Sequence, residues 1–259
     1  MTATDTEASP HTDTAPAEAW LTRLRLNPRS RAVQRDLRNI TDLHRTLMKL
    51  VPDGLGDAPR SQAGLLFRLE TDGVGRPTVL VQTRLSSSTD RLPADYAHAD
   101  IRPMNTVLAA LRPGLLVRYR IAANAVRRCG PNSTAGHWKQ VIPLHGPEAD
   151  QWWTERATTA GLTPRTLLTR STDPATTWHT PKQDATSPTI SAPTPPAPTS
   201  KADTKTFTDR RIDRAITVFE GTALVTDPEA LRTALLNGIG RSKSYGCGLL
   251  SLAPAGPGA

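Results

Sequence analysis

The order of strand-like and helical segments constrains the fold of this chain more than any other feature of its sequence. Trp20–Leu26 alternates apolar and polar residues, as a half-buried strand does, and Asn27-Pro28 ends it. The segments that follow are, in order, a helix over Ser30–Val51, strands over Leu65–Leu69 and Thr78–Thr83, a short helix near Pro103–Leu111 and a strand over Leu115–Ile121. The order β-α-β-β-α-β is that of a ferredoxin-like unit.

The second half of the chain repeats this order less clearly. Its expected elements are strands over Trp138–Leu144, Arg165–Arg170, Ile212–Val225 and Gly248–Leu252, and helices over Pro147–Ala160 and Pro228–Asn237. A length of 259 residues suits two small domains. We therefore predict an α+β protein of tandem ferredoxin-like (RRM-related) β-α-β-β-α-β domains with antiparallel sheets. The N-terminal domain is expected over residues 19–128 and the C-terminal domain over residues 129–259.

Two segments are predicted to lie outside the packed parts of these domains. Residues 1–18 are rich in Thr, Ala, Asp and Pro, which is typical of a disordered tail. Residues 171–205 hold many prolines among Thr, Ser and Ala, so we expect a low-complexity insertion that is extended or disordered. Its basic flanks suit a nucleic-acid-binding hairpin arm, although such a segment is more often only a solvated insertion.

The charge balance favours an anionic partner. Lys and Arg number 32 against 24 Asp and Glu, which gives a net charge of +8 and a pI near 10.1. Nucleic acid and a membrane surface both suit such a chain. No apolar run approaches the length of a bilayer span and the start lacks a signal-peptide pattern, so we expect a cytoplasmic protein. Cys129 and Cys247 are too few for a disulfide scaffold and lack zinc-ligand spacing, and no metal or cofactor is expected.

A glycine-bracketed basic loop, Gly238–Gly248, follows the predicted helix Pro228–Asn237. Asp227 suits the N-cap of that helix, Pro228 its first position, and Gly238 a left-handed residue after its end. The loop therefore leads from a helix into a strand, whereas nucleotide-binding glycine loops lead from a strand into a helix. This order excludes a nucleotide-triphosphate site. The loop is either an ordinary turn or a backbone that approaches a phosphate chain.

His44 is the leading candidate for acid–base chemistry. It lies beside the apolar stripe of Leu43, Leu47 and Leu50, so its ring can reach solvent. A histidine can act as a general base or acid near neutral pH. A lone histidine at a helix edge is, however, more often structural or simply exposed, and the position alone does not decide between these roles.

Several segments resemble one family of RNA-processing enzymes. They are the start Trp20-Leu-Thr-Arg-Leu-Arg-Leu-Asn-Pro-Arg-Ser-Arg-Ala, Asn39-Ile-Thr-Asp-Leu-His-Arg-Thr-Leu-Met-Lys49, Val79-Leu-Val-Gln-Thr83, Ala123-Asn-Ala125 and Gly238–Gly248. Together they resemble the CasE-type CRISPR repeat endoribonucleases of type I-E systems. The resemblance runs from Trp20 to Pro254, except in the proline-rich insertion.

The resemblance implies metal-independent cleavage of CRISPR precursor RNA at the base of the repeat stem-loop. The 2′-hydroxyl attacks, a 2′,3′-cyclic phosphate remains, and the enzyme stays bound to the mature guide RNA inside a larger surveillance complex. It implies catalytic roles for His44, as general base or acid, and for Lys49. On a helix, the side chains of positions 44 and 49 point about 140° apart. Lys49 therefore reaches the phosphate beside His44 only through its long stem, and otherwise it binds a neighbouring phosphate. Arg45 is the competing cation.

The remaining predicted RNA contacts are basic residues and loop glycines. Those outside the glycine loop are Arg127, Arg128 and Lys139, which bracket the turn Gly130–Gly136, and Arg210 and Arg211, which match a basic hairpin of the family. Those within the loop are Gly238, Gly240, Arg241, Lys243, Tyr245, Gly246 and Gly248. A duplex stem is recognised mainly through its shape and phosphates, so binding should depend strongly on salt.

One departure from the family keeps an alternative function open. Some members have a tyrosine three residues before the histidine, and this chain has Thr41 there. Threonine can cap the helix, but its hydroxyl does not replace a phenol in pKa or reach. Tyr245, a lysine, an arginine or a backbone group then supplies the second acid or base, or His44 suffices alone. The alternative is a subunit that binds repeat RNA without cleaving it.

Overall fold

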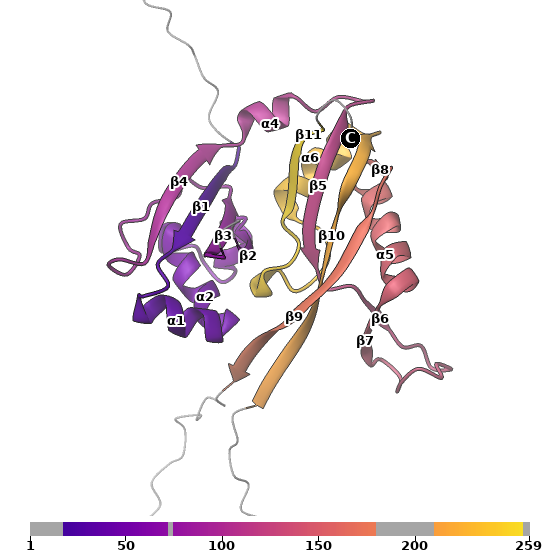
Figure 1. Cartoon of the computed structure of the whole chain (residues 1–259), viewed down its shortest axis with the longest axis horizontal. Helices are drawn as coiled ribbons and strands as arrows, with labels where there is room; N and C mark the ends of the chain where they lie inside the picture. Colours follow the sequence, from indigo (N-terminus) through magenta and orange to yellow (C-terminus); the bar gives the residue numbers. More distant parts are fainter. Residues whose placement is uncertain (1–17, 72–74, 180–209, 256–259) are drawn as a thin grey trace, which may run out of the picture.

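The chain folds into two antiparallel sheets that stand side by side, each packed against helices (Figure 1). The computed structural model describes residues 18–71, 75–179 and 210–255. The predicted tail thus lies outside the described residues, apart from Glu18. In the described part, no helix is long and apolar enough to cross a membrane.

The first sheet has the strand order β2-β3-β1-β4. Its strands are β1 (Trp20–Leu26), β2 (Leu66–Thr71), β3 (Pro77–Thr83) and β4 (Ala97–Pro103). β1 lies in the centre, pairing with β3 on one side and β4 on the other, so that Leu24 faces both Val79 and Ala99. This order, with the crossover helices between β1 and β2, is the ferredoxin-like arrangement that was predicted.

The strand that closes the first sheet is not the predicted one. The expected strand Leu115–Ile121 corresponds to β5 (Leu116–Ala123), which pairs with β10 and β11 of the second sheet. β4 takes its place at the edge, and its polar sequence Ala-His-Ala-Asp-Ile-Arg-Pro lacks the apolar alternation of a half-buried strand. The division between the sheets therefore falls between β4 and β5, ahead of the domain boundary predicted at residues 128 and 129. The helix α4 (Asn105–Ala109) lies in this connection.

The single helix predicted over Ser30–Val51 is interrupted. α1 (Arg31–Arg38) and α2 (Ile40–Leu47) are separated by Asn39, whose extended backbone breaks the helix and whose Oδ1 accepts the N–H of Thr41. Asn39, and not Thr41, is therefore the cap. α2 runs into a 3-10 turn, η1 (Met48–Leu50). Leu43 and Leu47 are buried against β1, β2 and β3 in the core of the first sheet.

The second sheet repeats the same strand arrangement in the order β11-β5-β10-β8, with β9 also paired to β10. Its other strands are β8 (Leu162–Pro164), β9 (Leu168–His179), β10 (Arg210–Val225) and β11 (Leu250–Pro254). The helices α5 (Gly146–Thr159) and α6 (Pro228–Asn237) cover it, with Trp153, Leu231 and Leu235 fully buried. Both helices match their predicted ranges closely, and the prediction of tandem ferredoxin-like domains is confirmed.

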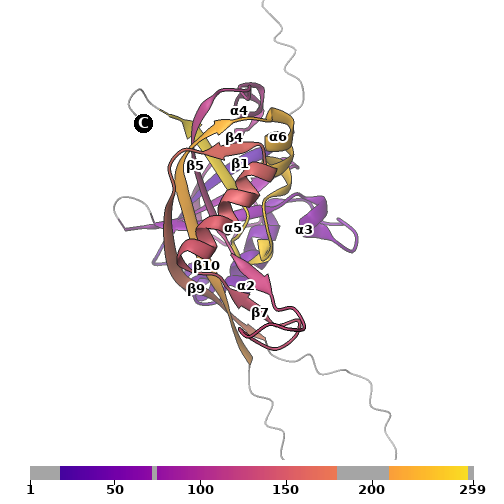
Figure 2. The same cartoon turned by 90° about the vertical axis from the view of Figure 1, so that its right-hand side faces the viewer.

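Two antiparallel ribbons extend beyond the second sheet at one end of the molecule (Figures 1 and 2). β9 and the start of β10 form the longer ribbon, in which Arg210 and Arg211 pair with His179 and Trp178. Residues 171–179 therefore belong to a strand and not to the predicted insertion, whose remainder up to residue 205 lies outside the described residues. The shorter ribbon pairs β6 (Val126–Arg128) with β7 (Val141–Pro143).

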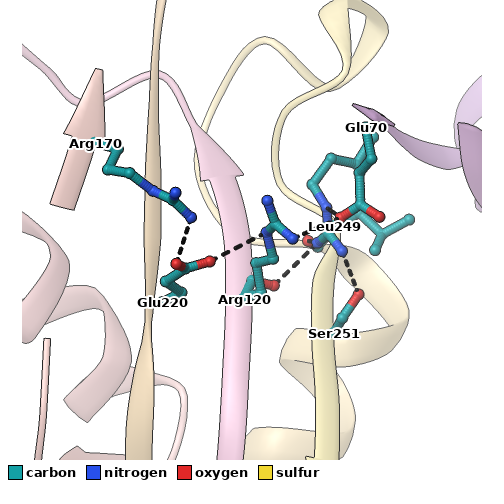
Figure 3. Close-up of polar contacts among 7 residues, drawn as sticks. Glu70, Arg120, Arg170, Glu220, Leu249 and Ser251 are labelled. Atoms are coloured by element: carbon teal, nitrogen blue, oxygen red, sulfur yellow. Dashed lines mark hydrogen bonds and ion pairs between the residues drawn. The ribbon is translucent and has the colours of Figure 1, made fainter. Parts of the chain in front are cut away.

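Arg68 of β2 joins the two sheets. Its guanidinium is almost fully buried and donates to the carbonyls of Arg120 and Leu249 and to Ser251 Oγ, at 3.0, 2.9 and 2.9 Å. It also pairs with Glu70 at 2.7 Å, and a chain of charges continues from Glu70 through Arg120 and Glu220 to Arg170 (Figure 3). Gln82 Nε2 adds a buried bond to Leu235 O at 2.8 Å. These contacts hold α6, β11 and the loop between them against the first domain.

Candidate active site

His44 lies in the middle of α2, at the contact between the two domains. Its ring stacks on the buried Phe67 of β2, with 6.1 Å between the ring centroids and 30° between the planes. The ring is half-buried, and its Nε2 has no hydrogen-bond partner among the described residues. This atom is closed to solvent, and a buried ring nitrogen without a partner is uncommon in proteins. It can accept a proton or hydrogen bond from a bound molecule once the neighbouring side chains move aside.

The glycine loop contacts α2 through its 3-10 turn η2 (Lys243–Tyr245). Gly238 and Gly248 close the loop, because Ile239 N–H donates to Gly248 O at 2.9 Å and a Cβ at Gly238 would lie 2.9 Å from that same oxygen. Gly238 has the predicted positive φ, 74°, but its ψ of 157° lies outside the left-handed helical region. A Cβ at Gly246 would lie 3.3 Å from Phe67, the ring on which His44 stacks. The loop and His44 therefore share one aromatic support.

Three cations gather around a cavity of about 370 Å³ beside this contact. Arg60 comes from α3 (Pro59–Gln62), Arg84 follows β3, and Lys243 belongs to the glycine loop. Arg84 and Lys243 both bind Asn237 at the end of α6, at 2.6 and 2.7 Å. In the part of the chain that the structure describes, none of the three cations pairs with a carboxylate. The cavity is therefore suited to an anion.

The surroundings keep His44 neutral at physiological pH. Burial lowers the pKa of His44 to about 4, and the positive charges of Arg60 and Arg45 contribute to the shift. Burial and Arg60 also lower the pKa of Lys243. Arg60 thus acts electrostatically on both His44 and Lys243, which places the three groups within one small region. Neutral imidazole is the form that can take a proton from a hydroxyl group.

Lys49 and Arg45, the other predicted site residues of the first domain, do not line this cavity. Lys49 is exposed on η1, beyond the end of α2. Arg45 is exposed as well, and it pairs with Asp42 at 2.7 Å. Thr41 stands one turn before His44 on α2. The angle expected between His44 and Lys49 assumed one continuous α-helix, but α2 ends at Leu47 and Lys49 lies in the 3-10 turn.

Tyr245 is half-buried and not an open stacking surface. Its ring packs against the core of the first domain, and the guanidinium of Arg214 lies over it at 5.5 Å. Gly240 and Arg241 lie at the opposite end of the loop, beside α5 and the short ribbon. Arg128 of the short ribbon lines the same hollow as Gly240 and Arg241, whereas Arg127 pairs with Glu148 at 2.9 Å. Lys139 lies over the Trp138 ring at 4.0 Å.

Arg60 and Arg84 are the site residues that sequence reasoning missed. Each stands in a short or irregular segment with no helical or strand periodicity, so no local signal marked them. Among the described residues, no group of three or more His, Cys, Asp or Glu side chains could hold a metal ion. Both cysteines are free and buried, and burial raises the pKa of Cys247 to about 12.

The chain is similar to known proteins over most of its length. The family model described as CRISPR associated protein matches residues 19–254. The CRISPR-associated endoribonuclease Cse3 of Thermus thermophilus is 34% identical over 236 residues, which are 91% of this chain and 100% of that protein.

Solved structures are similar over the same length. Thermus thermophilus Cse3, bound to an RNA that represents a pre-cleavage complex, is 30% identical with a TM-score of 0.67, over 92% of this chain and 100% of that one. A chain of a CRISPR RNA-guided surveillance complex, in a pre-nicking state, is 33% identical with a TM-score of 0.57, over 91% and 100%.

Proposed function

Because the chain belongs to the family of CRISPR-associated proteins, we propose that it is an endoribonuclease that processes CRISPR precursor RNA. It cleaves the repeat at the base of a stem-loop, leaves a 2′,3′-cyclic phosphate and stays bound to the mature guide RNA within a surveillance complex. One observation carries this proposal: among the described residues, His44 Nε2 has no hydrogen-bond partner, and its helix α2 meets a glycine loop whose cations form no ion pair. The precursor is a transcript, so the chain acts in the cytoplasm.

The reaction follows from these groups. The 2′-hydroxyl oxygen attacks the adjacent phosphorus, and its proton passes to His44 Nε2. The bond between phosphorus and the 5′-oxygen breaks, and that oxygen takes up a proton from the Lys243 ammonium or from solvent. A general base of this kind contributes about 10²–10⁴-fold to the rate.

The cations of the site support a mechanism without a metal ion. Negative charge develops on the phosphorus oxygens in the transition state, and in this proposal Arg60 and Lys243 offset it; the electrostatic effect of Arg60 on both His44 and Lys243 supports that role. Arg84 adds a third charge at the same cavity. A bound phosphate also raises the pKa of His44, since an opposite charge favours the imidazolium. Lys49, which is exposed after α2, binds a neighbouring phosphate.

The test is cleavage of repeat RNA in the presence of EDTA. The RNA is the repeat of the CRISPR array in the same genome, and the wild-type protein is compared with His44→Ala and His98→Ala. His98 is the matched control because it lies on the edge strand β4, beside Arg25. We expect cleavage by the wild type and His98→Ala, and a loss of at least about 10²-fold with His44→Ala.

Each other result has a distinct meaning. Binding of the repeat without cleavage by the wild type would favour the alternative of a non-catalytic RNA-binding subunit, which the threonine at position 41 suggests. Cleavage that stops in EDTA would contradict the metal-free mechanism. Full activity of His44→Ala would remove the catalytic role of this residue while leaving the RNA-processing function in place.

A further inference from the structure

The short ribbon β6–β7 carries a basic surface outside the active site. From Val126 to His145 the sequence contains Arg127, Arg128 and Lys139 and has no acidic residue. The ribbon forms its own two-stranded sheet, and it projects beside α5 at the same end of the molecule as the β9–β10 ribbon (Figures 1 and 2). It therefore extends the positive surface away from the sheet that anchors it.

Three arginines from distant parts of the chain meet at the base of this ribbon. Arg128 of β6, Arg156 of α5 and Arg241 of the glycine loop line a hollow of about 130 Å³. Over the described residues, none of the three forms an ion pair, in contrast to Arg127, which is held by Glu148. Guanidinium groups that share a hollow without a carboxylate repel one another, and they bind a phosphate well.

The hollow is connected to the active site through the glycine loop. Gly240 and Arg241 form part of its wall, while η2, farther along the same loop, contacts α2, the helix that carries His44. Ser242, which follows Arg241, donates its hydroxyl to the buried Asn124 at 3.3 Å, and Asn124 in turn binds Ala215 O at 2.6 Å. The loop is thus anchored between the two places. An RNA strand that followed the loop away from the active site would therefore reach the hollow.

Trp138 offers a stacking surface farther out on the same ribbon. Its side chain is 63% exposed, although tryptophan is highly buried on average. Lys139 lies over the ring at 4.0 Å, so a cation and an aromatic face are presented together. Unpaired bases stack on such rings, whereas the bases inside a duplex stem are covered by their neighbours.

From this arrangement we propose that the β6–β7 ribbon binds unpaired nucleotides that flank the repeat stem, with a backbone phosphate held by Arg128, Arg156 and Arg241 and a base stacked on Trp138. The inference rests on the proposed function and adds to it the part of the substrate that this surface recognises. The flank lies on either the 5′ or the 3′ side of the stem, and the chemistry of recognition is the same for both.

The experiment measures binding to three RNAs: the repeat hairpin alone, the hairpin with its 5′ flank and the hairpin with its 3′ flank. Each carries 2′-deoxyribose at the base of the stem, which removes the nucleophile. The variants are Trp138→Ala, Trp138→Phe and Arg156→Gln, with folding checked by circular dichroism. Arg112→Gln is the matched control. Arg112 is an exposed arginine that precedes β5, so it lies at the end of this strand opposite to the ribbon. Fluorescence anisotropy over a series of salt concentrations gives Kd and its salt dependence.

For one of the flanked RNAs we expect Trp138→Ala to raise Kd by about five-fold or more, and Trp138→Phe to restore most of the affinity. Arg156→Gln should lower the slope of log Kd against log salt by about 0.7, the value for one single-strand phosphate. The hairpin alone should bind all variants like the wild type, and Arg112→Gln should match the wild type on every RNA.

Equal losses on all three RNAs, or no loss on either flanked RNA, would overturn the inference. Cleavage of the repeat by the wild type, measured in parallel on unmodified RNA, separates this failure from failure of the proposed function. A wild type that cleaves while the ribbon variants bind normally refutes only the role of the ribbon. A wild type that binds no repeat RNA refutes both.

Discussion

Replacing Arg68 with methionine should separate the two domains more than any surface substitution. Arg68 is 3% exposed, and its guanidinium makes three hydrogen bonds to the second domain, to Arg120 O, Leu249 O and Ser251 Oγ. Methionine keeps part of the aliphatic packing but leaves two carbonyls without this donor and weakens the pairing of Glu70. The change therefore removes a buried charge and not only a contact.

The expected loss of unfolding free energy depends on the partners that Glu70 keeps. Removing one member of a buried ion pair costs about 3–5 kcal/mol. Glu70 keeps a longer contact with Arg120 at 3.7 Å and is partly exposed, so we expect a value near the lower limit, about 3 kcal/mol. For a protein of this size, that loss lowers Tm by about 6–12 °C.

Thermal unfolding followed by circular dichroism measures this effect, with Arg118→Met as the matched control. Arg118 is exposed on β5, forms no ion pair among the described residues and should change stability by less than about 0.5 kcal/mol. The double variant Arg68→Met/Glu70→Met should recover part of the loss, because no partly buried carboxylate is then left with a weakened partner. An Arg68→Met protein that melts within 1 °C of the wild type would show that these hydrogen bonds do not stabilise the domain contact.

Three further results are expected from other parts of the structure. The first concerns pH: the pKa of His44 in the free enzyme is lowered to about 4, and a general base must be neutral. The value of kcat/KM for cleavage should therefore be level from about pH 6 to 8 and fall as the pH drops towards 4. A steady tenfold fall of kcat/KM per pH unit above pH 5 would instead identify His44 as the acid. Gly238→Ala should destabilise the protein by about 1–3 kcal/mol in urea unfolding, since φ is 74° and the new Cβ would lie 2.8 Å from Leu66. An unfolding midpoint equal to that of the wild type would show that the loop adapts freely. Tyr96→Phe should cost about 1–3 kcal/mol by the same measurement, because the phenol donates to the fully buried carboxylate of Asp36 at 2.8 Å, and an unchanged midpoint would mean that Asp36 finds another donor.

Local patterns predicted many of the elements closely. β1, α5 and α6 match their expected ranges because alternation, N-cap residues and proline at the helix start are properties of neighbouring residues. Asp227 accepts from the N–H groups of Glu229 and Ala230, as its position before Pro228 predicted. The break at Asn39 was missed, since the apolar stripe continues from α1 to α2 and does not record the extended residue between them.

The fold class, the resemblance to CRISPR-processing enzymes, and the candidates His44 and the glycine loop could all be predicted from the amino-acid sequence. The place of β5 in the second sheet could not, because an alternating pattern shows which face of a strand is buried but not which strand it pairs with. The same holds for the site. Arg60 and Arg84 stand far from Lys243 in the chain, and packing of the two domains through Arg68 brings all three cations to one cavity, where their electrostatic effect on one another depends on distance in space.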